Sequence, residues 1–201
     1  MRRNFTKEVL LDEREVVNSI KQLAYPLQSK ADLQPLFNRI GDARIVMLGE
    51  ASHGTHEYYT WRSHISKRLI EEKGFNFIAV EGDWPDCYRL NRFVKGYDAD
   101  NKSAFNVLHA FNRWPTWMWA NWEIVALADW LQKHNKGLPA DKKAGFYGLD
   151  VYSLWESMDS IMQYLKKTDI AALEVAEEAY RCFEPYRKSE GQSYARASQF
   201  V

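Results

Sequence analysis

The stretch IVMLGEASHGTHE, residues 45–57, places ionisable side chains where an apolar run ends. Glu50 follows that run, His53 comes three residues later, and His56 three after that. A carboxylate beside a histidine raises its basicity and fixes its tautomer, which suits a general base near neutral pH. A lone histidine is more often a structural hydrogen-bonding residue, but the position after a strand-like run and beside Gly54 favours a functional one.

The same residues raise the alternatives of a metal site and of a side-chain nucleophile. The order E-x-x-H-x-x-H-E differs from the H-E-x-x-H of zinc proteases, and the spacing of Glu50, His53 and Glu81 is not diagnostic of an ion site. Ser52 lies in no G-x-S-x-G motif, and Cys87 has no evident activating base. The pattern favours a histidine that activates water, with no metal and no cofactor. A protein that binds metal or haem through the two glutamates and His53, without catalysis, remains the alternative.

Arg62 is a second candidate of a different kind. It lies on the apolar stripe of a helix expected over residues 55–73. A guanidinium on such a face must be paired, since an unpaired buried charge is very costly, and Glu50 or Glu81 could be the partner. Its remaining donors could hold a substrate oxygen, while a purely structural salt bridge is the equal alternative.

Glu123 is placed by similar reasoning. It shares a face with Trp119 on a helix expected over residues 118–136, so we expect it to point inward, as a site carboxylate or as a partner of Arg62. The tryptophans crowded into residues 113–122 could line a pocket for a bulky apolar ligand, or they could simply fill the core.

The elements that must position these residues follow from the hydrophobic patterning. Short apolar runs predict strands, and 3.6-residue periodicity bounded by Gly and Pro predicts helices. The order of these elements predicts an α/β fold, a mainly parallel sheet with flanking helices. The strands are expected over residues 44–50, 75–83 and 144–150, and the helices over 8–24, 33–43, 55–73, 84–96, 118–136, 154–167 and 170–182.

Each expected strand runs into an acidic residue: Glu50, Glu81 and Asp150. The carboxyl ends of parallel strands share one edge of the sheet, and ligands bind in the crevice beyond it. Any one of these acids could instead cap the helix that follows or interact with its dipole. Three acids in register, together with His53, favour a common site at that edge.

The composition limits the classes of partner. The chain carries 27 basic and 27 acidic residues, so its formal net charge is zero and nothing indicates binding to nucleic acid or to an anionic membrane. No apolar run is long enough to span a bilayer, and the N-terminus has no signal-peptide pattern. The two distant cysteines, Cys87 and Cys182, are expected to stay reduced in a cytoplasmic protein.

Four stretches together resemble the erythromycin esterase family, including its relatives labelled as succinoglycan biosynthesis proteins. These are LGEASHGTHEYY, FIAVEGDWPD, NWEIVALADWLQKHN and FYGLDVYSL, which span about residues 44–155 in the family's order. The resemblance implies a hydrolase that opens an ester, in the best-known members the lactone of a macrolide antibiotic, without a required metal. The expected partner is therefore a small-molecule ester or lactone.

The resemblance also implies residue roles. His53 would activate water, and Glu50, Arg62 and Glu81 would orient the base and the substrate. Family members are longer and carry a second functional histidine in the half not represented here. Residues 1–201 are therefore expected to be a single α/β domain that forms the N-terminal portion of a longer one, or else an inactive fragment. The remaining candidates are expected to contact the substrate: Glu123, Trp119, His56 and Asp150.

Overall fold

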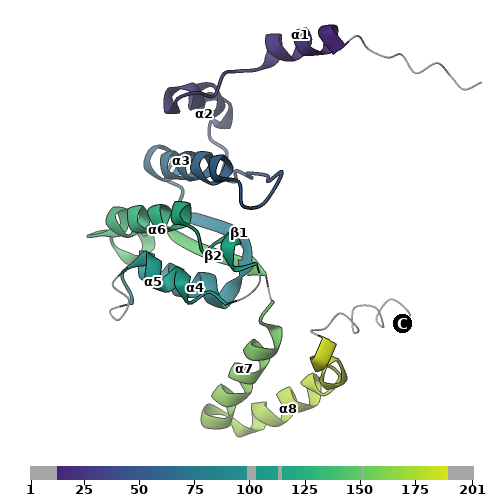
Figure 1. The fold of residues 1–201 in the computed structure, drawn as a ribbon. Coiled ribbons are helices and arrows are strands. Elements are labelled where there is room, and N and C mark those ends of the chain that lie inside the picture. Colours follow the sequence, from purple (N-terminus) through teal and green to yellow (C-terminus); the bar gives the residue numbers. More distant parts are fainter. Residues whose placement is uncertain (1–12, 99–102, 113–114, 151, 190–201) are drawn as a thin grey trace, which may run out of the picture. The chain divides into compact units, whose positions relative to one another are not determined.

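The computed structural model describes residues 13–98, 103–112, 115–150 and 152–189 (Figure 1). The chain divides into two compact units, residues 1–75 and residues 76–201, and each is described by itself. The expectation of one domain over residues 1–201 stays a prediction. Within the described ranges, no helix is both long and apolar enough to cross a membrane.

The first unit is helical, and its core lies between a short helical segment and one long helix. Leu33 and Phe37 pack against Ile65 and Leu69, and Trp61 covers part of the cluster. The first helix of the unit contributes no buried residue to this core. The elements are α1 (Glu13–Leu23), the 3-10 helix η1 (Lys30–Leu33), α2 (Gln34–Ile40) and α3 (His56–Lys73).

The boundaries of α3 follow from its flanking residues. Thr55 has an extended backbone before the first turn, and its carbonyl accepts the N–H groups of Tyr58 and Tyr59. Gly74 ends the helix with φ 72°, a left-handed conformation that glycine adopts without a steric penalty. The helix predicted over residues 55–73 is thereby confirmed.

The strand predicted over residues 44–50 is wrong. These residues belong to no strand in the described part of the chain. Ile45 and Met47 are 79% and 90% exposed, whereas Val46 and Leu48 pack against the core of the first unit. The segment therefore buries alternate residues, as one face of a strand would, without a hydrogen-bonded neighbour.

The second unit contains a parallel pair of strands, β1 (Phe77–Asp83) and β2 (Gly145–Asp150). Residues Phe77 to Val80 pair in order with Gly145 to Gly148, and a shift in register then aligns Asp83 with Asp150. At Gly148 an added Cβ would lie 2.4 Å from the carbonyl oxygen of Gly82, so glycine is required by the close approach of the two strands. The prediction of parallel pairing is confirmed.

Helices pack on this pair, and buried asparagines join them to it. Asn135 donates to the carbonyls of Val94 and Ala144, both at 2.8 Å, and its side-chain oxygen accepts from the Ala144 N–H at 2.7 Å. Asn91 accepts from the Phe146 N–H at 3.2 Å. The α/β class predicted from the sequence is confirmed, although β1 alternates exposed and partly buried residues and is not covered on both faces as expected.

The remaining elements match the predicted helices closely. The elements are α4 (Trp84–Val94), α5 (Ala104–His109), η2 (Thr116–Met118), α6 (Trp122–Asn135), η3 (Ala140–Lys142), α7 (Leu154–Thr168), α8 (Ile170–Tyr180) and η4 (Glu184–Ser189). Among the α-helices of the described residues, only the six-residue α5 was not predicted, and α6 begins four residues later than expected. The 3-10 helices η3 and η4 were not predicted either. The start of the helix predicted over residues 8–24, the tryptophan at position 114 and residues 190–201 lie outside the described residues.

Candidate functional site

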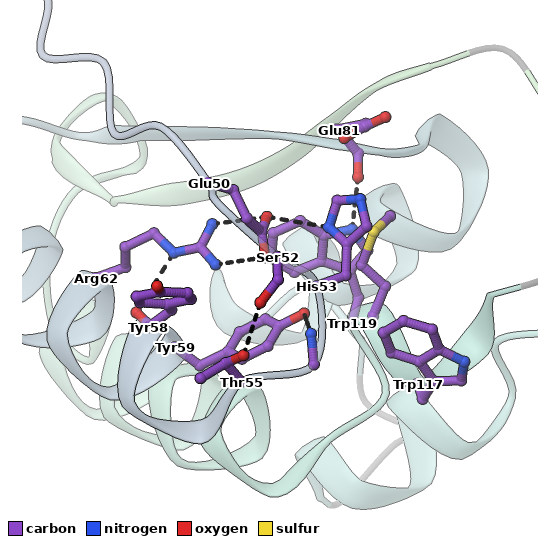
Figure 2. Close-up of polar contacts among 12 residues, drawn as sticks. Glu50, Ser52, His53, Thr55, Tyr58, Tyr59, Arg62, Glu81, Trp117 and Trp119 are labelled. Atoms are coloured by element: carbon purple, nitrogen blue, oxygen red, sulfur yellow. Dashed lines mark hydrogen bonds and ion pairs between the residues drawn. The ribbon is translucent and has the colours of Figure 1, made fainter. Parts of the chain in front are cut away.

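Glu50 and Arg62 form a two-point ion pair in the first unit (Figure 2). The two terminal nitrogens of Arg62 donate to the two carboxylate oxygens of Glu50 at 3.0 and 2.9 Å. A third donor, Arg62 Nε, reaches the carbonyl oxygen of Tyr58 at 3.4 Å. The side chains of Glu50 and Arg62 are only 16% and 20% exposed. The expectation that Glu50 pairs with Arg62 is confirmed.

His53 contacts the same carboxylate. Its Nδ1 lies 3.3 Å from Oε2 of Glu50, and its side chain is 44% exposed. A neutral imidazole that donates from Nδ1 keeps its lone pair on Nε2, the nitrogen that can accept a proton. Glu50 therefore fixes both the orientation and the tautomer of His53, while Arg62 fixes Glu50.

The charge state of Glu50 follows from these contacts. Burial alone would raise its pKa, but the hydrogen bonds and positive charge of Arg62, with a smaller contribution from His53, outweigh burial and lower the pKa below its ordinary value. Glu50 is thus a carboxylate at neutral pH, and it presents a fixed negative charge to the imidazole.

The turn before α3 holds His53 in place. The hydroxyls of Ser52 and Thr55 lie 2.8 Å apart, and the N–H of Gly54 donates to the hydroxyl of Tyr59 at 3.4 Å. Gly54 has φ 79°, which lets the chain reverse between His53 and the helix. Figure 2 shows these contacts together with the imidazole of His53.

His56 lies one helical position beyond the turn that holds His53. It is the first residue of α3, is exposed, and its Nε2 lies 3.4 Å from the hydroxyl of Thr60, one turn along the same helix. This placement gives His56 a local role at the start of the helix, and its expected contact with a substrate stays a prediction.

A hollow of about 360 Å³ adjoins the Glu50–Arg62 pair, and we call it the α3 hollow. Its lining surface is mostly apolar and comes entirely from the first unit. The sequence reasoning missed its aromatic wall, although Tyr58, Trp61 and Ile65 recur at helical spacing beside Arg62. The lining residues are Gly49, Glu50, Ala51, Tyr58, Trp61, Arg62 and Ile65.

In the second unit, Glu81 lies in β1 with its side chain exposed. Its backbone carbonyl accepts the indole N–H of Trp119 at 2.6 Å (Figure 2). Trp119 also meets the ring of Phe146 edge-on at 5.8 Å between centroids, and an added Cβ on Gly82 would lie 3.1 Å from its nitrogen. Trp119 is thus packed on the strand pair, which supports the core alternative for this tryptophan.

Asp150 ends β2 near Glu81 and carries an unusual carboxyl group. Its Oδ2 is buried and has no hydrogen-bond partner among the described residues. Burial first, and then the negative charges of Glu81 and Asp83, raise the pKa of Asp150, against a hydrogen bond from the backbone of Gly82. Glu81 and Asp150 therefore lie close at one edge of the strand pair, as predicted. That Glu50 shares this edge stays a prediction.

Asp83 has a structural task that the sequence reasoning did not assign. Its Oδ1 accepts the N–H of Ser153 at 3.0 Å and its hydroxyl at 2.9 Å, which ties the end of β1 to the start of α7. Nearby, burial and then the charges of the neighbouring aspartates raise the pKa of Cys87 to about 12. This thiol stays protonated at neutral pH, in agreement with the expectation that it is no nucleophile.

Glu123 lies in the first turn of α6 and is half-buried. The fully buried face of that helix consists of other residues, while the face expected to point inward is partly buried at Glu123 and Trp130 and exposed at Ala126, so that expectation is met only in part. The buried residues are Ile124, Leu127, Ala128, Leu131 and Asn135. A role for Glu123 as a site carboxylate or as a partner of Arg62 stays a prediction.

The structure thus brings together Glu50, His53 and Arg62 in the first unit, and Glu81, Trp119 and Asp150 in the second. Within the described part of the chain, no group of three or more His, Cys, Asp or Glu side chains is arranged to hold a metal ion.

Comparison with known proteins finds related sequences, among them two longer proteins. The chain is 27% identical over 163 residues to the erythromycin esterase type II of Escherichia coli. The aligned residues cover 79% of this chain and 36% of that protein. It is also 28% identical over 157 residues to the putative hydrolase YbfO of Bacillus subtilis (strain 168). The aligned residues cover 75% of this chain and 32% of that protein. The chain therefore spans about a third of the length of these relatives.

Two crystal structures have a similar fold. A succinoglycan biosynthesis protein superposes with a TM-score of 0.64 at 27% identity, over 90% of this chain and 45% of that chain. A Bacillus cereus protein superposes with a TM-score of 0.62 at 27% identity, over 84% of this chain and 40% of that chain. The fold of the chain is thus that of longer proteins.

A family comparison completes the assignment. The family model described as erythromycin esterase matches residues 70–201, about two thirds of the chain. The matched residues include Glu81 and Asp150, whereas Glu50, His53 and Arg62 precede them. Because the match covers more than half of the sequence, the chain belongs to the erythromycin esterase family.

Proposed function

We propose that the protein to which this chain belongs is a carboxylic ester hydrolase in which His53 activates water. Family membership supports hydrolysis at the level of the class. The observation that carries the mechanism is the contact of 3.3 Å between His53 Nδ1 and a carboxylate that Arg62 holds at two points. This arrangement leaves Nε2 to accept a proton.

In the proposed reaction, His53 Nε2 takes a proton from water while the water oxygen bonds to the ester carbonyl. The negative charge of Glu50 stabilises the imidazolium that forms. The tetrahedral intermediate then collapses, the bond to the alkoxide leaving group breaks, and His53 returns its proton to the alkoxide. The products are a carboxylic acid and an alcohol, or one hydroxy acid when the substrate is a lactone such as that of a macrolide.

Arg62 is proposed as a positioning residue. Three of its five donors are engaged by Glu50 and by the Tyr58 carbonyl, so its main effect acts through Glu50. The remaining two N–H groups could stabilise the oxyanion. Glu81 is proposed to orient the substrate, as the family resemblance implies, and four residues are proposed as substrate contacts: Asp150, Trp119, Glu123 and His56.

The test is His53→Ala in the product of the complete reading frame, assayed for hydrolysis of 4-nitrophenyl and lactone esters. We expect loss of at least about 10²-fold in kcat/KM, the usual contribution of a general base. The fold should be kept, because the His53 side chain is 44% exposed and contacts Glu50 at the edge of the site. His109→Ala, which changes an exposed histidine of α5, is the matched control and should retain activity. Turnover unchanged in His53→Ala would overturn the proposal.

The competing function is binding of a metal or haem by Glu50, His53 and Glu81 without catalysis. Metal analysis of protein purified without chelator separates the two. One equivalent of metal that is lost in His53→Ala, together with no ester hydrolysis by the wild type, would replace the hydrolase proposal.

A further inference from the structure

The α3 hollow lies beside the Glu50–Arg62 pair, and no role has yet been assigned to it. Glu50 belongs both to the wall of the hollow and to the contact with His53 Nδ1. One carboxylate therefore connects the proposed general base with the hollow. A group bound there would lie next to the residue that orients His53.

The charge of the hollow is balanced within its own wall. Glu50 and Arg62 are the acidic and basic residues of its lining, and they neutralise each other through two hydrogen bonds of 3.0 and 2.9 Å. A charged ligand would have to lose its hydration without gaining an unpaired opposite charge, which is unfavourable. The hollow is therefore suited to an uncharged group.

The rest of the wall is apolar. Ala51, Tyr58, Trp61 and Ile65 contribute aliphatic and aromatic surface, and the exposed lining is mostly carbon. Ligand pockets usually combine such a lining with a few fixed polar groups, as the hollow does with the Glu50–Arg62 pair. Burial of an apolar group here would be favourable by the ordinary hydrophobic effect.

The volume limits the size of the group. A hollow of about 360 Å³ lies near the lower end of the usual range for ligand pockets, about 300–1,000 Å³. It equals the share of liquid volume of about a dozen water molecules at about 30 Å³ each. A phenyl ring or a short acyl chain fits, and a macrocycle of several dozen atoms does not fit as a whole.

We propose that the α3 hollow binds a compact, uncharged apolar group on the acyl side or the alcohol side of the ester, and so selects the substrate. This inference rests on the proposed ester hydrolysis and names the substrate class for it. Ala51 and Tyr58 are the specificity-determining residues. Tyr58 contacts Arg62 through its backbone carbonyl, so its side chain can be changed without removing that contact.

The first experiment measures kcat/KM of the product of the complete reading frame for 4-nitrophenyl acetate, propionate, butyrate and benzoate, and for the anionic hemisuccinate. Acetates of ethanol and benzyl alcohol report on the alcohol side. We expect kcat/KM to rise about three- to fourfold for each added methylene on the side that enters the hollow, as burial of a CH₂ predicts. The hemisuccinate should be a poorer substrate than the butyrate.

Two variants test the location. Ala51→Leu fills the hollow and should remove the preference for the larger group, lowering the ratio of its kcat/KM to that of acetate about tenfold or more. Tyr58→Ala removes one wall and should weaken the preference through KM. Tyr88→Ala, an exposed tyrosine of the second unit, is the matched control and should leave the preference unchanged.

A binding measurement separates this inference from the proposed function. N-benzylacetamide, an uncharged amide that resembles the ester, is titrated into residues 1–201 and followed by NMR. We expect saturable binding that Ala51→Leu abolishes. Hydrolysis without selectivity, or selectivity unchanged in Ala51→Leu, overturns the inference and leaves the hydrolase proposal standing. Saturable binding without hydrolysis of any ester overturns the hydrolase proposal instead.

Discussion

At the scale of single residues, Glu50 is the centre of the candidate site. It accepts two hydrogen bonds from Arg62, contacts His53 and forms part of the wall of the α3 hollow. The role of His53 as a base depends on the position of this carboxylate, and that position depends on the guanidinium. Changes at Arg62 should therefore act on the imidazole indirectly.

Arg62→Gln should lower kcat more than it raises KM, because it leaves Glu50 free to turn away from His53. Loss of a charged hydrogen-bonded partner should also cost about 1–3 kcal/mol in the free energy of unfolding. Arg62→Lys should recover only part of the activity, since an ammonium cannot make the two-point contact. Steady-state kinetics with a pH profile, together with urea denaturation, measure both effects.

The exposed Arg39 of α2 supplies the control. Arg39→Gln removes the same charge within the first unit and should leave kcat and the pH profile unchanged. Equal effects of the Arg39 and Arg62 variants would show that net charge, and not the position of Glu50, is what matters.

The lowered pKa of Glu50 gives a second prediction, on stability. A carboxyl whose pKa is lower in the folded state than its ordinary value of 4.5 stabilises the fold above that value, and the contribution is lost as the pH falls through the folded pKa. Glu50→Gln should therefore destabilise the protein at neutral pH, and the difference from wild type should shrink below about pH 4.5.

Urea midpoints of wild type and Glu50→Gln over this pH range measure the difference. Glu57→Gln, an exposed position in the first turn of α3, corrects for the loss of one negative charge. A gap that stays constant down to acid pH would contradict the assigned role of the Glu50–Arg62 pair.

At the scale of elements, the close approach of β1 and β2 depends on the glycine at position 148. An added Cβ at Gly148 would meet the backbone oxygens of Gly82 and Asp83 at 2.4 and 2.8 Å. Backbone atoms cannot turn aside as a flexible side chain can, so the strands themselves would have to separate.

Gly148→Ala should therefore destabilise the second unit by more than about 2 kcal/mol, as overpacking of rigid backbone does. Gly74→Ala is the comparison, because at Gly74 nothing lies within 4 Å and the cost comes only from φ 72°, about 1 kcal/mol. Urea denaturation followed by circular dichroism measures both. An equal or smaller cost at Gly148 would contradict the close approach of β1 and β2.

Most elements could be predicted from the sequence because their signals are local. Gly74 ends α3 and Pro85 lies in the first turn of α4, and both positions match the structure. Residues 44–50 could not be assigned correctly in this way, because a strand needs a hydrogen-bonded neighbour and an apolar run does not say whether one is there. The fully buried face of α6 is that of Ile124, Leu127 and Leu131, next to the face that was inferred with Trp119, a residue that precedes the helix.

The candidate site was predictable only in part. Glu50 and Arg62 pair as expected, because a charged residue on an apolar helix face requires a partner and few were available. The α3 hollow was not predicted. Its shape depends on the path of the chain around residues 49–51, which no periodicity describes.

At the scale of the whole molecule, the described chain has two cores. One is built around Phe37 and Leu69 in the first unit, and the other includes Leu90, Leu131 and Phe146 in the second. If each core stabilises its own unit, a substitution in one core should lower the stability of that unit more than the stability of the other.

Hydrogen exchange measured by mass spectrometry tests this independence. Leu69→Ala should raise exchange over residues 30–73, and Leu131→Ala should raise it over residues 77–150, with costs of about 2–5 kcal/mol expected for buried leucines. Val175→Ala, an exposed position on α8, is the control and should change neither region. Equal changes in both units from either leucine variant would mean that the chain unfolds as a single cooperative unit.

The exposed segment before Glu50 has a practical consequence for handling the protein. Among the described residues of the first unit, no backbone hydrogen bond joins residues 45–49 to another residue, and Ile45 and Met47 are large apolar residues that are 79% and 90% exposed. Such a row of open donors and acceptors is a template for intermolecular β-pairing. Residues 1–201 should self-associate through this segment at high concentration, and Met47→Lys should reduce this self-association.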